Sequence, residues 1–294
     1  ELHDYLERTF PNAHRAMKRE KVGKFSLLYT WEGSDKSLKP AMLMGHQDVV
    51  PIAAGTEQNW QHAPFSGDVA DGFVWGRGAW DDKSSLVSYL EAVEMLAASG
   101  AQPKRTLIIA SGHDEEVGGL RGAREIAALL DSRGVKLEFV IDEGMIVTTG
   151  IVPTIARPVA QIGLAEKGYV TLSVTAEGAP GHSSMPGKDS VIGAVASGVE
   201  KLQANQMPAR LDARQSLEQL APEMAPLNRV VLSNLWLTKP LATSILAQSG
   251  GSNALIRTTT ALTVFNAGSK ENVLPGKAEA LVNFRIAPGD SVAS

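Results

Sequence analysis

The chain has 294 residues, of which 44% are hydrophobic and 20% charged, and its formal net charge is −4. This balance is typical of a globular protein and argues against disorder, collagen and coiled coil, while the length allows one large domain or two ordinary ones. No basic block is present, so nucleic-acid binding has no support. The absence of cysteine excludes disulfides, thiolate zinc sites and cysteine nucleophiles. No apolar run approaches the ~18 residues that a membrane-spanning helix needs.

Short apolar runs alternate with helical patterns in the first half of the chain. Residues 41–45, 106–110 and 137–141 are apolar and end in polar residues, as buried strands of a parallel sheet do. Between these runs, residues 83–99 and 120–133 carry apolar stripes at helical spacing, and a glycine follows each. Strands separated by helices predict an α/β fold with a doubly wound, mostly parallel sheet.

The pattern changes after residue 158. Three later segments alternate apolar and polar residues like half-buried strands, and a helical segment behind Asp189 as N-cap lies between the first two of them. These segments are residues 168–176, 189–203, 258–266 and 279–286. A β-α-β-β order on an antiparallel sheet indicates a small α+β domain. The sequence therefore predicts two domains, residues 1–158 and residues 159–294.

Both ends of the sequence are interpreted as truncated. The chain starts without an initiator methionine, and it stops where a second helix of the α+β domain is due. We therefore expect a longer parent chain and an α+β domain that is incomplete at its C-terminus. A signal peptide or anchor before Glu1 stays open, so the sequence predicts no compartment.

Ionisable side chains follow all three apolar strands of the first domain. The strands lead into residues 46–48, 113–116 and 142–143, and residues 81–82 open the first helix. In a parallel sheet these strand ends lie along one edge, which is where α/β proteins bind ligands. One imidazole among so many carboxylates needs a cation, or several of the acids must stay protonated.

This set of side chains suits a divalent metal ion. Histidine and carboxylates without thiolates are typical of Zn²⁺ sites, with Mn²⁺ or Co²⁺ as alternatives. A carboxylate shared by two ions would give a two-metal hydrolytic site. The alternative is that each acidic pair only caps a helix or ends a strand in solvent. That explanation accounts for a single pair more readily than for four clusters at corresponding ends.

Four motifs resemble those of the M20 family of zinc metallopeptidases. They are residues 46–51 (HQDVVP), 76–83 (GRGAWDDK), 114–119 (DEEVGG) and 181–184 (GHSS). Their order and spacing are family-like, and the resemblance extends over residues 41–286. It is strongest to the branch of carboxypeptidase S and the N-acyl-amino-acid hydrolases. The resemblance implies a catalytic zinc-binding domain, over residues 1–158, and an inserted α+β lid that often dimerises, over residues 159–294.

The resemblance implies a set of metal ligands. His46 would bind the first zinc, Asp81 would bridge both ions, and Glu116 would bind the second. The acidic residue after the third strand would complete the first site. Asp142 and Glu143 stand side by side there, and we favour Asp142 while Glu143 stays open.

The resemblance also implies catalytic and substrate-binding residues. Glu115 would be the general base for a metal-activated water, and Asp48 would hold the second nitrogen of the histidine ligand. In the lid, His182 would stabilise the oxyanion, in some relatives from the partner subunit. Asn272 and Arg285 would hold polar groups of the substrate, and the guanidinium of Arg285 can grip a carboxylate in bidentate fashion.

One ligand that the family requires is missing from this sequence. The second zinc site is completed by a histidine that follows the lid, and the chain ends within the lid. The resemblance implies zinc-dependent hydrolysis of an amide bond next to a free carboxylate, in a C-terminal peptide bond or an N-acyl amino acid. Two alternatives stay open: an aminopeptidase or deacylase on the same two-zinc core, and a catalytically dead metal-binding fragment.

Overall fold

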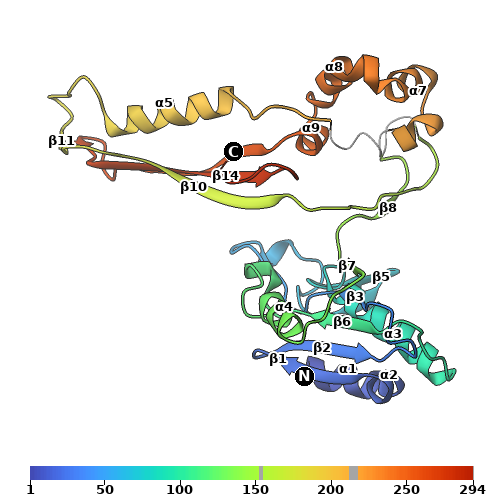
Figure 1. Ribbon diagram of the computed structural model, residues 1–294. Helices are drawn as coiled ribbons and strands as arrows, with labels where there is room; N and C mark the ends of the chain where they lie inside the picture. The colour runs from blue at the N-terminus through green and yellow to red at the C-terminus, as the bar shows by residue number, and fades with distance from the viewer. Residues whose placement is uncertain (152–154, 212–217, 294) are drawn as a thin grey trace. The chain divides into compact units, whose positions relative to one another are not determined.

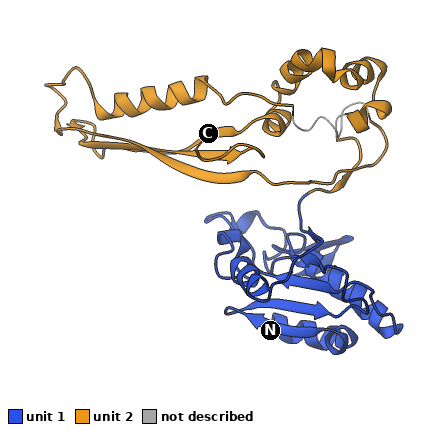
Figure 2. Cartoon of the chain, viewed as in Figure 1, with its two compact units in different colours: residues 1–144 blue, residues 145–294 orange. Residues whose placement is uncertain are grey.

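The computed structural model describes residues 1–151, 155–211 and 218–293. The chain divides into two compact units, Glu1–Gly144 and Met145–Ser294 (Figure 2). This division lies earlier than the predicted boundary after residue 158. The strand β8 (Val147–Thr148), which lies before that boundary, pairs with β9 (Val159–Ala160), and both belong to the second unit. The catalytic and lid roles of the two parts stay predictions.

The first unit contains a mixed sheet in the order β1-β2-β6-β3-β7 (Figure 1). Its strands are β1 (Lys18–Val22), β2 (Ser26–Trp31), β3 (Ala41–Met44), β6 (Leu107–Ser111) and β7 (Phe139–Ile141). The three strands expected from the apolar runs pair in parallel, with β3 between β6 and β7. The strands β1 and β2 add antiparallel pairings, because a short turn joins them and strands joined so closely can only run in opposite directions. The predicted α/β class is confirmed.

Helices cover both faces of this sheet. On one face lie α1 (Leu2–Thr9), α2 (Pro11–Ala16) and α3 (Lys83–Ala98), and on the other lies α4 (Ala123–Ser132). Because successive side chains of a strand point to opposite faces, Tyr29 of β2 packs with the first group and Leu28 with α4. Two hydrophobic cores therefore hold the sheet in a doubly wound arrangement.

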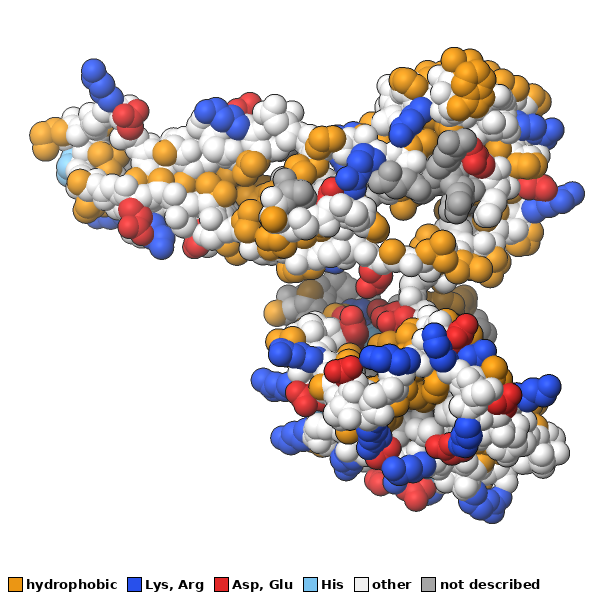
Figure 3. Space-filling view, in the orientation of Figure 1, with side chains coloured by type: hydrophobic (Ala, Val, Ile, Leu, Met, Phe, Trp, Pro, Cys, Tyr) orange, Lys and Arg blue, Asp and Glu red, His pale blue; other side chains and the backbone are white. Residues whose placement is uncertain are grey.

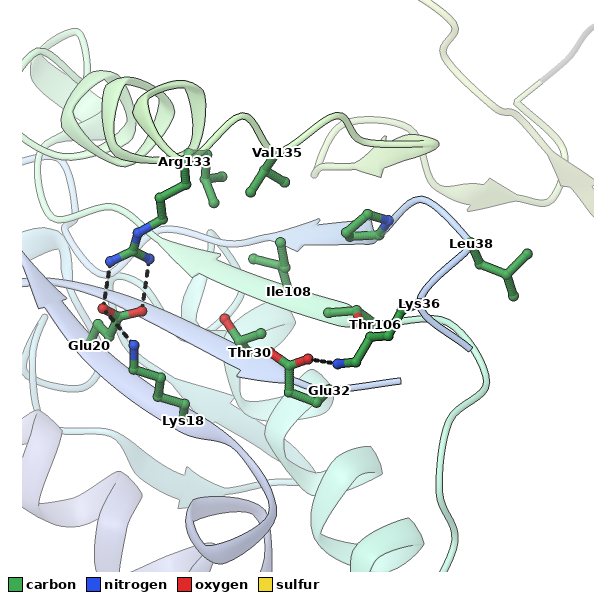
Figure 4. A pocket seen from close by; sticks show the side chains of 12 residues that line it. Lys18, Glu20, Thr30, Glu32, Lys36, Leu38, Thr106, Ile108, Arg133 and Val135 are labelled. Atoms are coloured by element: carbon green, nitrogen blue, oxygen red, sulfur yellow. Dashed lines mark hydrogen bonds and ion pairs between the residues drawn. The ribbon is translucent and has the colours of Figure 1, made fainter. Parts of the chain in front are cut away.

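An ion pair between Arg133 and Glu20 connects the end of α4 to the edge strand β1 (Figure 4). Arg133, just after α4, donates two hydrogen bonds to the carboxylate of Glu20 in β1, at 2.7 and 3.0 Å. Lys18 lies 3.2 Å from the same carboxylate. The hydrogen bonds from Arg133 lower the pKa of Glu20 below its ordinary value. The pocket around this pair shares no residue with the ionisable clusters at the strand ends.

The remaining elements of the first unit are short. They are η1 (Glu57–Asn59), the hairpin of β4 (Asp68–Ala70) and β5 (Phe73–Trp75), and the 3₁₀ turn η2 (Glu115–Val117). The turn η2 follows β6 directly and carries two of the predicted site residues. Its position sets the geometry of the site.

The second unit has the predicted α+β composition. Its sheet, in the order β10-β14-β12, is antiparallel and consists of β10 (Gly168–Glu177), β12 (Thr259–Ala267) and β14 (Lys277–Ile286). The helix α5 (Val191–Ala204) packs Val195 and Val199 against this sheet. Its N-cap is Ser190 rather than Asp189, because the Ser190 hydroxyl accepts the Gly193 N–H at 2.9 Å.

Two smaller parts complete the second unit. The short strands β11 (Gly181–His182) and β13 (Val273–Leu274) pair with each other. A helical part contains η3 (Ala221–Glu223), α7 (Pro226–Ser233), α8 (Leu235–Leu246) and α9 (Gly250–Ile256), and it leaves many apolar side chains exposed (Figure 3). Within the described ranges, none of the helices has both the length and the apolar character to cross a membrane.

Candidate metal centre

The imidazole of His46 is held at the carboxyl edge of the sheet. Beyond the end of β3, Gly45 donates its N–H to Ala110 at 3.1 Å and Gln47 donates to Gly112 at 2.8 Å. These bonds extend the parallel pairing past the strand and fix the backbone on both sides of His46, which is 5% exposed. A Cβ at position 45 would lie 3.2 Å from the backbone nitrogen of Leu86, so glycine here lets α3 approach closely.

Acidic side chains from three other segments surround this imidazole. The Nε2 atom of His46 lies 2.9 Å from Asp81, 3.5 Å from Glu143 and 3.9 Å from Glu115, measured to a carboxylate oxygen. Two groups have donor atoms that all lie within 4.8 Å of one another: His46 with Asp81 and Glu143, and His46 with Glu115 and Glu116. The strand ends that were expected to meet therefore do so within the first unit.

The second imidazole nitrogen of His46 faces the Asp48 residue. Nδ1 lies 3.0 Å from the backbone oxygen of Asp48 and 3.4 Å from its carboxylate. A carbonyl oxygen can only accept a hydrogen bond, so Nδ1 carries a proton. The lone pair of a neutral ring is then on Nε2, the nitrogen that faces the acids. This orientation is typical of histidine ligands whose second nitrogen is held by the protein.

Burial and crowded negative charge together alter the ionisation of this cluster. Burial, reinforced by the charge of Asp82, raises the pKa of Glu143 from its ordinary 4.5 to about 7. Burial also raises the pKa of Glu115, against the opposing effect of His46. For His46, burial lowers the pKa, but Glu143 and Asp81 outweigh it and the net shift is upward. A bound cation would relieve this crowding, so the imidazole and carboxylate donors fit a divalent metal ion such as Zn²⁺, Mn²⁺ or Co²⁺.

The two acidic residues after β7 occupy different positions. Glu143 directs a carboxylate oxygen towards His46, whereas Asp142 accepts the backbone N–H of Glu143 at 3.0 Å. Among the described residues, Asp142 belongs to neither group of clustered donors. The sequence interpretation favoured Asp142 and left Glu143 open; the carboxylate that lies near His46 is that of Glu143, and the choice of ligand stays a prediction.

Asp82 and Lys83 contribute to the site in ways that the motif did not reveal. Asp82 is 3% exposed, and its two oxygens accept the Ser85 hydroxyl at 2.5 Å and the His46 N–H at 3.3 Å. It therefore ties the start of α3 to the backbone of His46. The sequence signal is an acid at a helix start with a serine three positions later. Burial lowers the pKa of Lys83 below its ordinary value, although the nearby charges of Asp48 and Asp81 oppose this shift.

In the second unit, His182 and Asn272 lie on neighbouring segments. His182 pairs with Val273, and Ser183 donates its N–H to the backbone oxygen of Asn272 at 3.1 Å. The Ser184 N–H donates to Nδ1 of His182 at 3.2 Å, and the Ser184 hydroxyl lies 2.8 Å from the same atom. A backbone N–H can only donate, so the neutral ring carries its proton on Nε2. His182 is exposed and can offer that proton as a hydrogen-bond donor.

Arg285 lies apart from these two residues within the second unit. It is exposed, pairs with Tyr169 across the sheet, and places its guanidinium 4.8 Å from the centre of the Tyr169 ring. The strand β13, which pairs with His182, adjoins the other end of β14, at Lys277. Arg285 lies eight positions after Lys277 in this strand, a distance of about 26 Å at ~3.3 Å per residue. The second unit thus brings His182 and Asn272 together but not Arg285.

Comparisons with known proteins agree with this geometry. The family model "Peptidase family M20/M25/M40" matches residues 42–266. The chain is 42% identical to the "Probable carboxypeptidase S-like 2" of Dictyostelium discoideum and 44% identical to the "N-fatty-acyl-amino acid synthase/hydrolase PM20D1" of Mus musculus. Each alignment covers 99% of this chain, with 56% and 58% of the relatives, respectively. The chain therefore spans a little over half the length of these relatives, and the predicted branch is confirmed.

A solved structure extends the likeness to the fold. The crystal structure of human carnosine dipeptidase 1 matches with a TM-score of 0.60 and 16% identity, over 99% of this chain and 65% of that chain. At that identity the likeness supports the fold alone. It agrees with the α/β unit and the α+β unit described above.

Proposed function

The chain belongs to peptidase family M20/M25/M40, and on this premise we propose that the protein hydrolyses an amide bond next to a free carboxylate. The observation that carries the proposal is the meeting of His46 with Asp81, Glu115, Glu116 and Glu143 at one edge of the sheet. The named relatives add the substrate class. A carboxypeptidase and an N-acyl-amino acid hydrolase both act on substrates with a carboxylate beside the amide.

The proposed metal ligands follow from the two clusters. His46 and Glu143 would hold the first ion, Glu116 the second, and Asp81 would bridge the two. Bound divalent ions would polarise the substrate carbonyl and lower the pKa of water. The carboxylates that are crowded without a cation are the groups that such ions would neutralise. Zinc is the ion that we propose on the basis of this donor set.

The remaining residues of the proposed mechanism move or donate protons. Glu115 would take a proton from the attacking water and return it to the leaving amine, and its raised pKa brings it closer to the pH of the reaction. The Nε2–H of His182 would stabilise the oxyanion, and Arg285 would bind the substrate carboxylate. His182 lies near the Lys277 end of β14, and Arg285 lies ~26 Å further along this strand. This separation supports His182 and Arg285 serving one substrate from different subunits of a homodimer.

The function can be tested with matched substrates. The purified protein should release amine from an N-acyl amino acid and from a dipeptide with a free C-terminus, and much more slowly from their C-terminal amides. A chelator should abolish the release, and zinc should restore it. Equal rates on acids and amides would contradict the carboxylate requirement. Metal uptake without product from any of these substrates would favour a binding protein.

Asp81 and Asp82 should differ in their effect on metal content. Asp81 faces His46 and is proposed to bridge two ions, so Asp81→Asn should lower occupancy at both sites. Both oxygens of Asp82 are already used by Ser85 and His46, so Asp82→Asn should keep the metal and lower the melting temperature instead. Elemental analysis and thermal unfolding measure the two effects. The opposite order of metal loss would move the bridge to Asp82.

Metal affinity should rise with pH between about 6 and 8. The pKa of His46 is raised and that of Glu143 is about 7, so at the lower pH both groups hold protons that a metal ion must displace. Each displaced proton should contribute up to about tenfold in affinity per pH unit. Zinc competition against a chromophoric chelator measures the slope. Glu143→Gln should weaken binding and flatten this slope, whereas an unchanged slope would remove Glu143 from the set of ligands.

A further inference from the structure

The turn η2 carries both the proposed base Glu115 and the proposed ligand Glu116. The first N–H groups of a helical turn have no partner inside that turn and need an acceptor from elsewhere. The residue before the turn, Asp114, directs one oxygen of its carboxylate to the N–H of Arg121 at 2.7 Å. That oxygen is therefore engaged further along the chain, and the other Asp114 oxygen is buried without a hydrogen-bond partner, so neither caps η2.

The carboxylate of Asp48 instead accepts the first N–H groups of the turn η2. One of its oxygens accepts the N–H of Glu115 at 3.1 Å, and the other accepts the N–H of Glu116 at 3.0 Å. Asp48 follows β3 and precedes the turn by 67 residues, so it caps the turn from a different segment of the chain. Both bonds involve an ionised acceptor, which makes them stronger than bonds between neutral groups.

The contact of the Asp48 carboxylate with His46 is longer than its two hydrogen bonds to the turn η2. The Nδ1 atom of His46 lies 3.4 Å from the Asp48 carboxylate but 3.0 Å from the Asp48 backbone oxygen. The imidazole therefore has a hydrogen-bond partner in the backbone carbonyl as well as the carboxylate nearby. A substitution of the Asp48 side chain leaves that carbonyl in place.

The other end of the turn is held by local groups. Gly118 has a φ of 100°, a conformation that suits glycine, and it ends the turn. Gly119 donates its N–H to the backbone oxygen of Asp114 at 2.7 Å. The C-terminal end thus depends on residues of the same loop, whereas the N-terminal end depends on Asp48.

We propose that Asp48 is a positioning residue whose carboxylate caps the turn η2 from the segment after β3 and so fixes the backbone of Glu115 and Glu116 relative to His46. The catalytic part of this inference rests on the proposed function, but the anchoring of the turn does not. Loss of the cap would displace the base and its neighbour together, and a displacement of about 1 Å is enough to slow catalysis markedly.

The test is Asp48→Asn, which keeps the size of the side chain. Its amide oxygen can accept one N–H, but its NH₂ group faces the other, so one donor of the turn is left unpaired. Hydrogen–deuterium exchange of the Glu115 and Glu116 amides should accelerate by about 10–100-fold. In the same protein kcat should fall by about tenfold, while KM and metal content change little.

Two further variants serve as controls. Asp35→Asn alters a carboxylate that accepts the Ser37 N–H at 2.9 Å in an exposed turn of the same unit, and it should leave the exchange of both glutamate amides unchanged. Asp48→Glu retains the charge and two oxygens, so it should restore part of the exchange protection and part of kcat. If Asp48→Asn does not fold, amide exchange and kcat can still be measured on Asp48→Glu.

The outcomes separate the anchoring from the proposed function. Unchanged exchange at both amides in Asp48→Asn would overturn the proposal, whatever happens to activity. Loss of metal without faster exchange would overturn it as well, because Asp48 would then act through His46. Faster exchange in a protein whose parent hydrolyses none of the matched substrates would support the anchoring and reject the proposed function.

Discussion

Glu115→Gln should lower kcat by at least about 10²-fold and leave the metal content unchanged. The amide keeps the size of the carboxylate but cannot take a proton from water. Glu115 lies 3.9 Å from Nε2 of His46, further than Asp81 or Glu143, as expected of a side chain that faces the reacting water rather than the ion. Amine release under saturating substrate and elemental analysis of the same sample measure the two quantities.

The neighbouring glutamate supplies the matched control. Glu116→Gln changes an adjacent carboxylate in the same turn, and it should lose part of the metal along with activity. Both side chains belong to one group of clustered donors, so the contrast assigns their roles directly. Metal loss in Glu115→Gln together with retention in Glu116→Gln would exchange the two assignments. Near-normal turnover of Glu115→Gln would remove it from the mechanism.

Arg285→Ala should lower kcat/KM for carboxylate substrates by about 10–100-fold, mainly through a higher KM. This corresponds to the ~1.5–3 kcal/mol of a hydrogen bond to a charged group. The guanidinium is exposed and lies over the ring of Tyr169, which presents it in a defined orientation without an ion-pair partner among the described residues. A substrate carboxylate that enters a site rich in acids needs such a cation.

Two comparisons distinguish carboxylate binding from support of the fold. The C-terminal amide of the same substrate lacks the charge, so its slow hydrolysis should hardly change in Arg285→Ala. Lys277→Ala removes a cation from the other end of β14, where Lys277 pairs weakly with Glu177 at 3.8 Å, and it should leave kinetics on both substrates unaltered. Equal losses on acid and amide in Arg285→Ala would mean that Arg285 stabilises the unit and that another residue binds the carboxylate.

Local sequence patterns were sufficient for the fold class and for predicting that the ionisable strand ends meet. Apolar runs that end in ionisable residues predict strands whose ends meet, because the carboxyl ends of parallel strands share an edge. The structure confirms that β3, β6 and β7 pair in this way. The same patterns could not place β1 and β2, since their antiparallel pairing depends on the short turn between them and on β6, more than seventy residues away.

The positions of neighbouring side chains with the same chemistry follow only from the tertiary structure. Asp142 and Glu143 have the same chemistry and adjacent positions, and which one reaches His46 depends on the path of the backbone after β7. The two oxygens of Asp48 bind a turn that lies 67 residues further along the chain. A sequence pattern records which donors and acceptors a segment carries. Their partners are set by the packing of distant segments, because hydrogen bonds act over about 3 Å and depend on direction.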